Sequence, residues 1–269
     1  QPLEAFISGR QPEGYQPYED SLTAKVQGKL LQYFDIMGEG KRQSQRDKET
    51  LQSLVSDISH QVKTPVANIR MFSGILRQHQ LTPEKQEQFL LTMEEQIDKL
   101  DFLMQSLIKM SRLETGTFTL HTEEARLADT IAQAMSGVWA KAEAKGISLS
   151  ADCDSGITVQ HDPKWTAEAL GNILDNAIKY TPEGGRVSVS VRPWQFYTRV
   201  DITDTGIGIP EELYNRVFQR FYRAPQVAAR EGVGLGLYLA NGIITRQKGY
   251  ISVKSAVGRG STFSVYLLS

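Results

Sequence analysis

Two runs of heptad-spaced apolar residues, joined by a short turn, limit the folds open to this chain more than any other feature. In the first run, apolar residues recur in alternating steps of four and three: Leu51, Val55, Ile58, Val62, Pro65, Ile69, Phe72 and Leu76. The second run has the same spacing, with Leu90, Met93, Ile97, Leu100, Met104 and Leu107. This period predicts two long helices, each with an apolar seam that must pack against a partner helix.

The turn between the two runs, at residues 78–83, predicts an antiparallel helical hairpin. Thr82 is placed to cap the second helix and Pro83 to begin it. One hairpin leaves apolar surface uncovered, and pairing two hairpins into a dimeric four-helix bundle covers it. A coiled-coil hairpin that only joins proteins together explains the same heptads.

A histidine lies within the first run, in the stretch S-D-I-S-H-Q-V-K-T-P at residues 56–65. If Ile58 takes the first heptad position, His60 lies off the apolar seam and faces water. Thr64, four residues later, lies on the same face one turn further on. On its own, a histidine in such a position is more often a solvated surface residue than a functional one.

Composition narrows the class of protein. The 269 residues suggest two domains, or one domain with a long helical extension. Charges almost balance, with 30 Lys and Arg against 31 Asp and Glu and no basic block, so nothing points to nucleic acid. Cys153 is alone, which excludes an internal disulfide framework and fits a reducing compartment. No apolar run is long enough to span a bilayer and the first residue is glutamine, so we expect the soluble part of a longer protein.

The pattern changes after Glu114, where short strands and amphipathic helices alternate. We expect strands at residues 118–121, 147–151, 187–192, 200–204, 250–255 and 261–268. We expect helices at residues 126–145, 162–180 and 235–248, with Asp162 and Pro163 beginning the second. The predicted fold is therefore multidomain, α and α+β: a long helical hairpin followed by an α/β sandwich with a largely antiparallel sheet and helices on one face.

The stretch N-I-L-D-N-A-I-K-Y, residues 172–180, falls on the second of these helices. Asn172, Asn176, Lys179 and Tyr180 share one side of it. Two amides on one face can offer carbonyl oxygens to Mg²⁺, and a lysine one turn later can reach phosphates. An ordinary polar helix face gives the same pattern.

Two glycine-rich stretches follow. In D-T-G-I-G-I-P, residues 204–210, Asp204 can accept a hydrogen bond from an exocyclic amine, and Gly206 and Gly208 let the backbone approach a flat base. A simple turn has the same composition. In G-V-G-L-G-L, residues 232–237, glycines and a helix N-terminus suit phosphate oxygens. Its spacing is neither that of the dinucleotide fingerprint nor that of a Walker loop.

The segment between these stretches, R-V-F-Q-R-F-Y-R-A at residues 216–224, predicts a mobile lid. Its arginines, Arg220 and Arg223, are the candidates to lie near phosphates.

Taken in order, H-Q-V-K-T-P, N-I-L-D-N-A-I-K-Y-T, D-T-G-I-G-I-P, F-x-R-F-Y-R and G-V-G-L-G-L resemble a sensor histidine kinase of two-component systems. The resemblance covers about residues 45–269. It implies a linker and signalling helix at 1–44, a dimerisation and histidine phosphotransfer hairpin at 45–115, and a catalytic domain of the gyrase/Hsp90/kinase ATP-binding type at 116–269.

The resemblance also implies roles for single residues. His60 would be the phosphoacceptor, Asn172 and Asn176 would hold Mg²⁺, Lys179 would meet phosphates, and Tyr180 would lie against the nucleotide. Asp204 would read the adenine amine. The remaining residues that it assigns to the ATP site are Gly206, Gly208, Arg220, Arg223, Gly232, Gly234, Leu235, Gly236 and Thr262.

One departure from the family pattern concerns the base. Many members have an acidic residue directly after the histidine, where this chain has Gln61, an amide that can orient the imidazole but cannot take a proton. Asp57, one turn back, is a candidate substitute. Thr64 matches the residue that the family uses to position water for dephosphorylating the partner.

The implied reaction is transfer of the γ-phosphoryl group of Mg-ATP to His60 and then to an aspartate on a response regulator receiver domain. The implied partners are a second copy of the chain, the response regulator and, through a missing N-terminal transmembrane segment, a membrane. The chain would then be the cytoplasmic portion of a bacterial cell-membrane protein. Two alternatives remain: a hydrolysing ATPase, against which Asn172 argues because that class has glutamate there, and a phosphatase-biased or non-catalytic dimeric scaffold that binds nucleotide.

Overall fold

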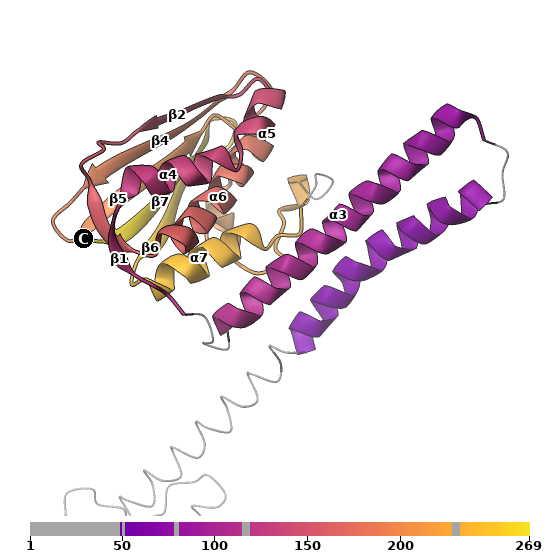
Figure 1. Ribbon diagram of the computed structural model, residues 1–269, viewed down its shortest axis with the longest axis horizontal. Helices are drawn as coiled ribbons and strands as arrows, with labels where there is room; N and C mark the ends of the chain where they lie inside the picture. The colour runs from indigo at the N-terminus through magenta and orange to yellow at the C-terminus, as the bar shows by residue number, and fades with distance from the viewer. Residues whose placement is uncertain (1–48, 50–51, 78–80, 115–118, 228–231) are drawn as a thin grey trace, which may run out of the picture. The chain divides into compact units, whose positions relative to one another are not determined.

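The computed structural model describes residues 49, 52–77, 81–114, 119–227 and 232–269 (Figure 1). The predicted linker and signalling helix at 1–44 lies outside these residues, as do Leu51 and residues 78–80 of the predicted turn. The chain divides into two compact units, residues 1–64 and 65–269. Among the described residues, no helix combines the length and the apolar character that a membrane span requires.

Residues 52–64 of the first unit are helical, as the heptads predict. His60 and Thr64 are both exposed on this helix, and the Thr64 hydroxyl lies 3.5 Å from the His60 carbonyl oxygen, to which it donates. The backbone stays helical through Pro65 to residue 77.

In the second unit, residues 65–77 pack antiparallel to α3 (Pro83–Glu114). The rings of Phe72 and Phe89 stack with centroids 5.3 Å apart, and Asn68 Nδ2 donates to Gln96 Oε1 at 3.5 Å. Since the earlier residue of one helix meets the later residue of the other, the two run in opposite directions. The predicted hairpin is confirmed, and α3 begins at Pro83 as expected.

The heptad of α3 is only half covered. Leu90, Ile97 and Met104 are 47%, 52% and 55% exposed. The alternate members of the same heptad, Met93, Leu100 and Leu107, are half-buried. Further along, Leu103, Met110 and Leu113 are buried, and α3 there packs against α7.

The α/β part is built from helices α4 (Leu127–Ser136), α5 (Trp139–Ala144), α6 (Pro163–Tyr180) and α7 (Gly236–Arg246). Its strands are β1 (Glu123–Arg126), β2 (Ser148–Asp152), β3 (Thr158–His161), β4 (Arg186–Pro193), β5 (Tyr197–Asp204), β6 (Tyr250–Ala256) and β7 (Gly260–Leu268). Short 3₁₀ turns occupy Glu211–Leu213 and Pro225–Val227.

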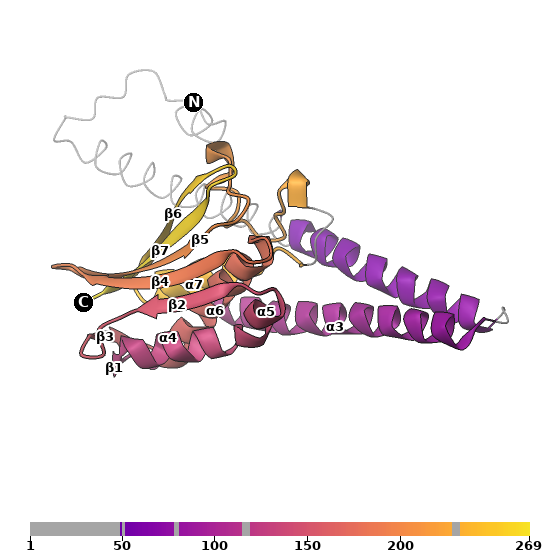
Figure 2. The same ribbon diagram turned by 90° about the horizontal axis from the view of Figure 1, so that it is seen from above.

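Five of these strands form one sheet in the order β2-β4-β5-β7-β6, in which only the β2–β4 pair is parallel. Helices α4, α6 and α7 lie together on one face of the sheet (Figures 1 and 2). The core forms between them from alternating strand residues and one side of α6: Val187, Val189, Val200, Ile202, Phe263, Val265, Leu170, Ile173 and Leu174. The predicted fold class, a helical hairpin followed by a largely antiparallel α/β layer, is confirmed.

Two local predictions are wrong. The single helix expected at 126–145 is two helices, α4 and α5, separated at Gly137 and Val138, because glycine weakens a helix interior by about 1 kcal/mol. Residues 119–122 form no strand; the strand begins later, as β1, and pairs with β3 in a two-stranded sheet. That pairing joins residues more than thirty positions apart, which local sequence pattern does not encode.

Candidate functional site

A cavity of about 470 Å³ lies between α6, the loop after β5, the segment at 213–227 and the residues leading into α7. Most of the predicted site residues line it: Asn172, Asn176, Lys179, Tyr180, Asp204, Gly208, Arg223, Gly232, Gly234, Leu235 and Gly236. The structure thus gathers motifs that are up to 60 residues apart in the chain. Gly206, Arg220 and Thr262 are not among the lining residues.

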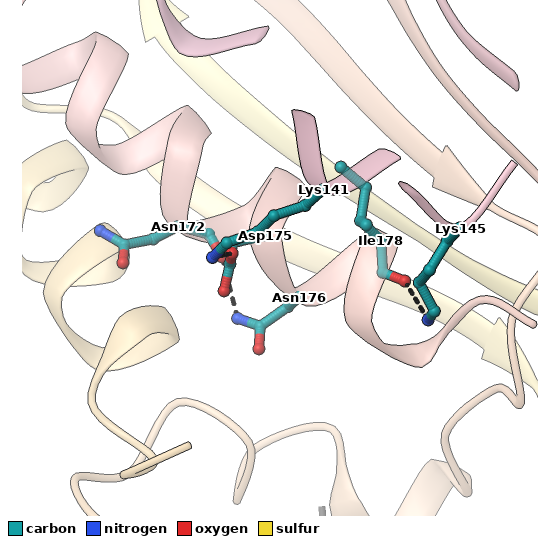
Figure 3. Close-up of polar contacts among 6 residues, drawn as sticks. All are labelled: Lys141, Lys145, Asn172, Asp175, Asn176 and Ile178. Atoms are coloured by element: carbon teal, nitrogen blue, oxygen red, sulfur yellow. Dashed lines mark hydrogen bonds and ion pairs between the residues drawn. The ribbon is translucent and has the colours of Figure 1, made fainter. Parts of the chain in front are cut away.

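The two asparagines of α6 have their amide oxygens turned toward the cavity (Figure 3). Asn172 Nδ2 donates to the Glu168 carbonyl at 3.0 Å, and Asn176 Nδ2 donates to the Asn172 carbonyl at 2.9 Å. A backbone carbonyl only accepts hydrogen bonds, so the amide nitrogen must face it. Neither Oδ1 accepts a hydrogen bond from a described residue, and both are available to a ligand.

Gly236, the first residue of α7, lies against this pair. A Cβ atom placed there would be 3.2 Å from Asn172 Oδ1. The absence of a side chain therefore lets the N-terminus of α7 approach the amides, and backbone N–H groups at a helix N-terminus favour anions.

Lys179 and Tyr180 form the end of α6 that borders the cavity. The Lys179 ammonium lies 5.0 Å from the centroid of the Tyr180 ring, a cation–π arrangement. Gly232, with φ of +120°, lies beside this ammonium, and a Cβ there would be 2.4 Å from Nζ. Glycine is favoured at 232 by the backbone angle, and its lack of a side chain leaves room for the Lys179 ammonium.

Asp204, at the end of β5, is buried. Its Oδ1 accepts hydrogen bonds from the backbone N–H groups of Gly206 at 2.7 Å and Ser261 at 3.2 Å. Burial raises the pKa of this carboxyl, and the two N–H donors partly offset the rise. Because Oδ2 has no donor among the described residues, the carboxylate is oriented to accept one more hydrogen bond, from a ligand in the cavity.

The loop after Asp204 depends on its glycines for close packing. A Cβ on Gly206 would lie 2.8 Å from the Tyr180 carbonyl oxygen. Gly208 has φ of +72°, and a Cβ there would lie 2.0 Å from the Ala256 carbonyl oxygen. Between them, the Ile207 N–H donates to the Tyr180 carbonyl at 3.3 Å. Gly206 therefore shapes the site from behind rather than lining it.

The predicted lid packs through its aromatic residues. Phe218 meets Phe263 edge to face at 6.3 Å, and Arg223 lines the cavity while its Nη2 donates to the Val227 carbonyl at 2.8 Å. Arg220 instead lies 3.9 Å from Glu114 at the end of α3. Of the two arginines, only Arg223 reaches the cavity; movement of the segment stays a prediction.

The expectation for Thr262 does not fit the strand register. Its hydroxyl is hydrogen-bonded to Thr203 at 3.0 Å, whereas its neighbours Ser261 and Phe263 line the cavity. Side chains along a strand alternate between faces, so a shift of one residue reverses the face. In the sequence, the apolar residues Phe263, Val265 and Leu267 alternate along this strand, and all three are buried. Continuing the same alternation backwards places Ser261, not Thr262, on their face.

A lysine and an aspartate at the cavity were not predicted. Lys141 of α5 and Asp175 of α6 both line it, and Lys141 Nζ lies 2.5 Å from Asp175 Oδ1 (Figure 3). Their side chains are 67% and 42% exposed, so the ion pair contributes little stability, about 0–1 kcal/mol. It does engage one of the carboxylates of the cavity.

In the first unit, the histidine and its neighbours lie along one helix. Asp57 Oδ2 accepts a weak hydrogen bond from the Ser53 hydroxyl at 3.5 Å, one turn before it. In the described part of the chain no hydrogen bond joins Asp57 to His60. Gln61 is half-buried next to the exposed His60.

Among the described residues, no group of three or more His, Cys, Asp and Glu side chains is arranged to hold a metal ion. A carboxylate cage for a cation is therefore absent from this part of the chain. The oxygens of Asn172 and Asn176 instead suit a cation that completes its coordination with ligand phosphates and water, as Mg²⁺ commonly does.

Comparison with known proteins identifies two domain families in the chain. Residues 50–116 match the His Kinase A (phospho-acceptor) domain. Residues 161–269 match the family described as histidine kinase-, DNA gyrase B-, and HSP90-like ATPase.

Similar whole proteins carry consistent names. The sensor-like histidine kinase SenX3 of Mycolicibacterium smegmatis is 30% identical over 222 residues, which are 82% of this chain and 58% of the relative. The Acinetobacter baumannii histidine kinase AdeS has a similar fold, with a TM-score of 0.65 and 21% identity over 78% of this chain and 97% of that one. The histidine kinase ThkA, solved in complex with the response regulator protein TrrA, gives a TM-score of 0.69 with 21% identity over 86% of this chain and 66% of that one. The matched stretch covers 58% or less of the curated relatives, and 27% of one of them.

Proposed function

Because the chain belongs to the sensor histidine kinases of two-component systems, we propose that it transfers the γ-phosphoryl group of ATP to His60 and from there to an aspartate of a response regulator. The observation that carries this proposal is the combination of an exposed histidine in a phospho-acceptor domain with a cavity lined by two outward-facing amide oxygens, a lysine and a buried carboxylate.

The cavity residues fit Mg-ATP. Asp204 Oδ2 accepts from the exocyclic amine of adenine, and the loop at Gly206 and Gly208 bounds the base. Lys179 and the N-terminus of α7 face the phosphates. Asn172 Oδ1 and Asn176 Oδ1 would hold Mg²⁺, which would supply positive charge to neutralise the phosphates.

The cavity favours transfer to His60 over hydrolysis. Hydrolysis at a useful rate needs a group that takes a proton from water, normally a carboxylate. Among the residues that the structure describes, the carboxylates lining the cavity are Asp175, which is paired with Lys141, and Asp204, which is held by two backbone N–H groups. At Asn172 the chain has an amide, which cannot take a proton. The hydrolysing ATPase is accordingly the weaker alternative.

At the acceptor, a neutral ring nitrogen of His60 forms a bond to the γ-phosphorus while the bond from that phosphorus to the β–γ bridging oxygen breaks, releasing ADP. The ring proton leaves with solvent or with a nearby base, for which Asp57 is the candidate since Gln61 cannot serve. Gln61 orients the ring. The carboxylate of the response regulator then attacks this phosphorus, the N–P bond breaks, and the imidazole of His60 leaves and regains its proton from solvent. Thr64 supports a second activity, dephosphorylation of the regulator, by positioning the water that removes the phosphoryl group.

The uncovered heptad of α3 supports a homodimer. Leu90, Ile97 and Met104 recur every seven residues and are about half exposed, although their spacing is that of a packed seam. A second hairpin placed on this seam completes a four-helix bundle.

The remaining partners follow from the family. A separate response regulator receives the phosphoryl group, in keeping with the complex in which ThkA was solved. A transmembrane segment ahead of residue 1 would anchor the protein, so that the present chain works on the cytoplasmic side of a bacterial membrane. The linker and signalling helix at 1–44, the hairpin at 45–115 and the ATP domain at 116–269 would pass the signal in that order.

Label transfer tests the proposal. The protein is incubated with Mg-ATP labelled at the γ-phosphate or, as the control, at the α-phosphate. We expect γ-label on the protein and no α-label. Phosphate release without labelled protein would identify a hydrolase, and bound nucleotide with neither product would identify a scaffold; either result contradicts the proposal.

A further inference from the structure

Lys145 makes an unusual set of contacts at the C-terminal end of α6. Its Nζ donates hydrogen bonds to the carbonyl oxygens of Ile178 at 2.9 Å, Lys179 at 3.1 Å and Thr181 at 2.8 Å. The first of these is drawn in Figure 3. A lysine ammonium has three donors, and all three are used on the backbone of one helix end. No salt bridge joins Lys145 to an acidic side chain in the described part of the chain.

These contacts satisfy backbone carbonyl groups that the end of a helix leaves without hydrogen-bond donors. The last carbonyls of a helix have no intrahelical partner, and the end of the helix dipole there carries partial negative charge. A glycine in the left-handed conformation commonly closes such an end. Here Thr181 is extended, with φ of −81° and ψ of 133°, and Pro182 has no N–H to donate. The ammonium of Lys145, the residue that follows α5, takes the place of the missing backbone donors.

The same end is fixed from a second side by the loop that follows Asp204. The Tyr180 carbonyl, the only one between 178 and 181 that Lys145 does not bind, accepts from the Ile207 N–H at 3.3 Å. Lys145 and Ile207 together thus bind all four carbonyls of this turn, three by Lys145 and one by Ile207. That turn carries Lys179 and Tyr180, which line the cavity.

Lys145 itself is firmly placed. It follows the last residue of α5, where Gly146 with φ of +60° turns the chain and Gly146 N–H donates to the Glu143 carbonyl at 2.9 Å. The Lys145 carbonyl accepts from the Gly184 N–H at 3.2 Å. Its backbone is therefore fixed on both sides of the side chain, which lowers the entropy lost when the ammonium is held.

We propose that Lys145 is a positioning residue of the nucleotide site, which sets Lys179, Tyr180 and the 204–210 loop by binding the carbonyls of the turn between them. The inference rests on the function proposed above. It assigns no contact between Lys145 and the nucleotide. Lys141, four residues earlier and within α5, also lines the cavity but differs because its ammonium forms an exposed ion pair with Asp175.

The test compares wild type with Lys145→Met, which keeps an unbranched side chain one atom shorter and removes its charge and donors. Lys254→Met, at an exposed lysine on β6, is the matched control. Autophosphorylation is measured against Mg-ATP concentration, at a temperature where all three proteins are folded. We expect Lys145→Met to raise KM about ten-fold or more, since small displacements of binding groups have effects of this size. We expect kcat at saturating ATP to stay within about three-fold of wild type.

A role in stability alone predicts a different result, because a smaller folded fraction lowers the maximal rate and leaves KM unchanged. An unchanged KM, or an equal rise in Lys254→Met, would overturn the inference. If Lys145→Met does not fold, Lys145→Leu, which is neutral and has no donor, replaces it with the same expectation and the same contrary result.

Hydrogen exchange separates this inference from the proposed function. In the protein without nucleotide, we expect Lys145→Met to speed exchange of the Thr181 amide, which lies on the loosened turn, and of the Ile207 amide, whose acceptor is the Tyr180 carbonyl of that turn, while β7 amides are unchanged. If wild type neither binds nor uses ATP, the proposed function is wrong, and the inference then depends on this readout: unchanged protection of both amides overturns it.

Discussion

The substitution Asp204→Asn separates nucleotide recognition from folding more cleanly than any other change in the cavity. An amide at this position can keep its oxygen where Asp204 Oδ1 is, accepting from Gly206 N–H and Ser261 N–H. Its nitrogen then replaces Oδ2. An acceptor that faces the cavity becomes a donor, and it would meet the amine of adenine, which is also a donor.

The size of the effect follows from the bond that is lost. A hydrogen bond to a charged group contributes about 1.5–3 kcal/mol, which corresponds to about a ten- to hundred-fold rise in the Kd for ATP. GTP carries a carbonyl where ATP carries the amine, so we expect the ratio of GTP to ATP affinity to rise as well.

The stability of Asp204→Asn, unlike its affinity for ATP, should not fall. Burial raises the pKa of Asp204 in the folded protein above its value in the unfolded chain. The folded state therefore binds the proton more tightly, and stability falls as pH rises between the two pKa values. A neutral amide avoids this loss, so we expect the Tm of Asp204→Asn at neutral pH to equal or exceed that of wild type.

The assay is calorimetric titration of ATP, ADP and GTP with thermal melts of the same samples, and Asp152→Asn, an exposed aspartate on β2, is the control. Wild-type affinity for ATP in Asp204→Asn would refute the assignment of Asp204 to the base. A large fall in Tm together with lost binding would show instead that the carboxylate is structural.

Four further predictions address the pH dependence, the metal, the loop and the dimer. As pH is lowered, wild-type affinity for ATP should fall when Asp204 takes up its proton. Because burial raises the pKa of Asp204, this fall should occur at a higher pH than for a carboxyl of ordinary pKa. Titrations of ATP across pH check this, and an affinity curve identical to that of Asp204→Asn would contradict it. Asn176→Ala should raise the Kd for Mg-ATP about ten-fold and shrink the loss of affinity caused by EDTA, whereas an unchanged EDTA effect would remove Asn176 from the metal site. Gly208→Ala, whose Cβ would lie 2.0 Å from the Ala256 carbonyl oxygen at φ of +72°, should lower the free energy of unfolding by at least about 2 kcal/mol in urea melts; wild-type stability would show that the loop relaxes at little cost. Ile97→Glu, at an exposed position of the α3 heptad, should convert a dimer to a monomer in light scattering, while Asp98→Asn beside it should not; two dimers would place the interface elsewhere.

The sequence predicted the parts of the fold and site that local pattern encodes. Heptad spacing predicted the hairpin, and helical spacing placed Asn172, Asn176, Lys179 and Tyr180 on one side of α6. Asp162 was expected to cap that helix, and its side chain does accept from the Trp165 N–H. In each case the information lies within one or two turns of a helix.

The parts that it did not predict depend on contacts between distant segments. From the sequence alone, Lys145 looks like any other lysine at a helix end. Its acceptors on α6 lie 33 or more residues later in the chain, so only the fold brings them to it. The pairing of β1 with β3 likewise needs the fold. Thr262 shows a different failure, since a one-residue choice within a strand decides which face a side chain takes. Ser261, not Thr262, supplies the second N–H to Asp204.

Acid and base treatment of protein labelled with γ-labelled Mg-ATP tests the central claim most directly. Wild type, His60→Gln and the control His121→Gln, at an exposed histidine, are compared under the same conditions. Transfer to a histidine nitrogen predicts label on wild type and on the control that is lost in acid and kept in base, with none on His60→Gln. Equal label on all three proteins, or label on wild type that survives acid, would contradict the assignment of His60 as the phosphoacceptor.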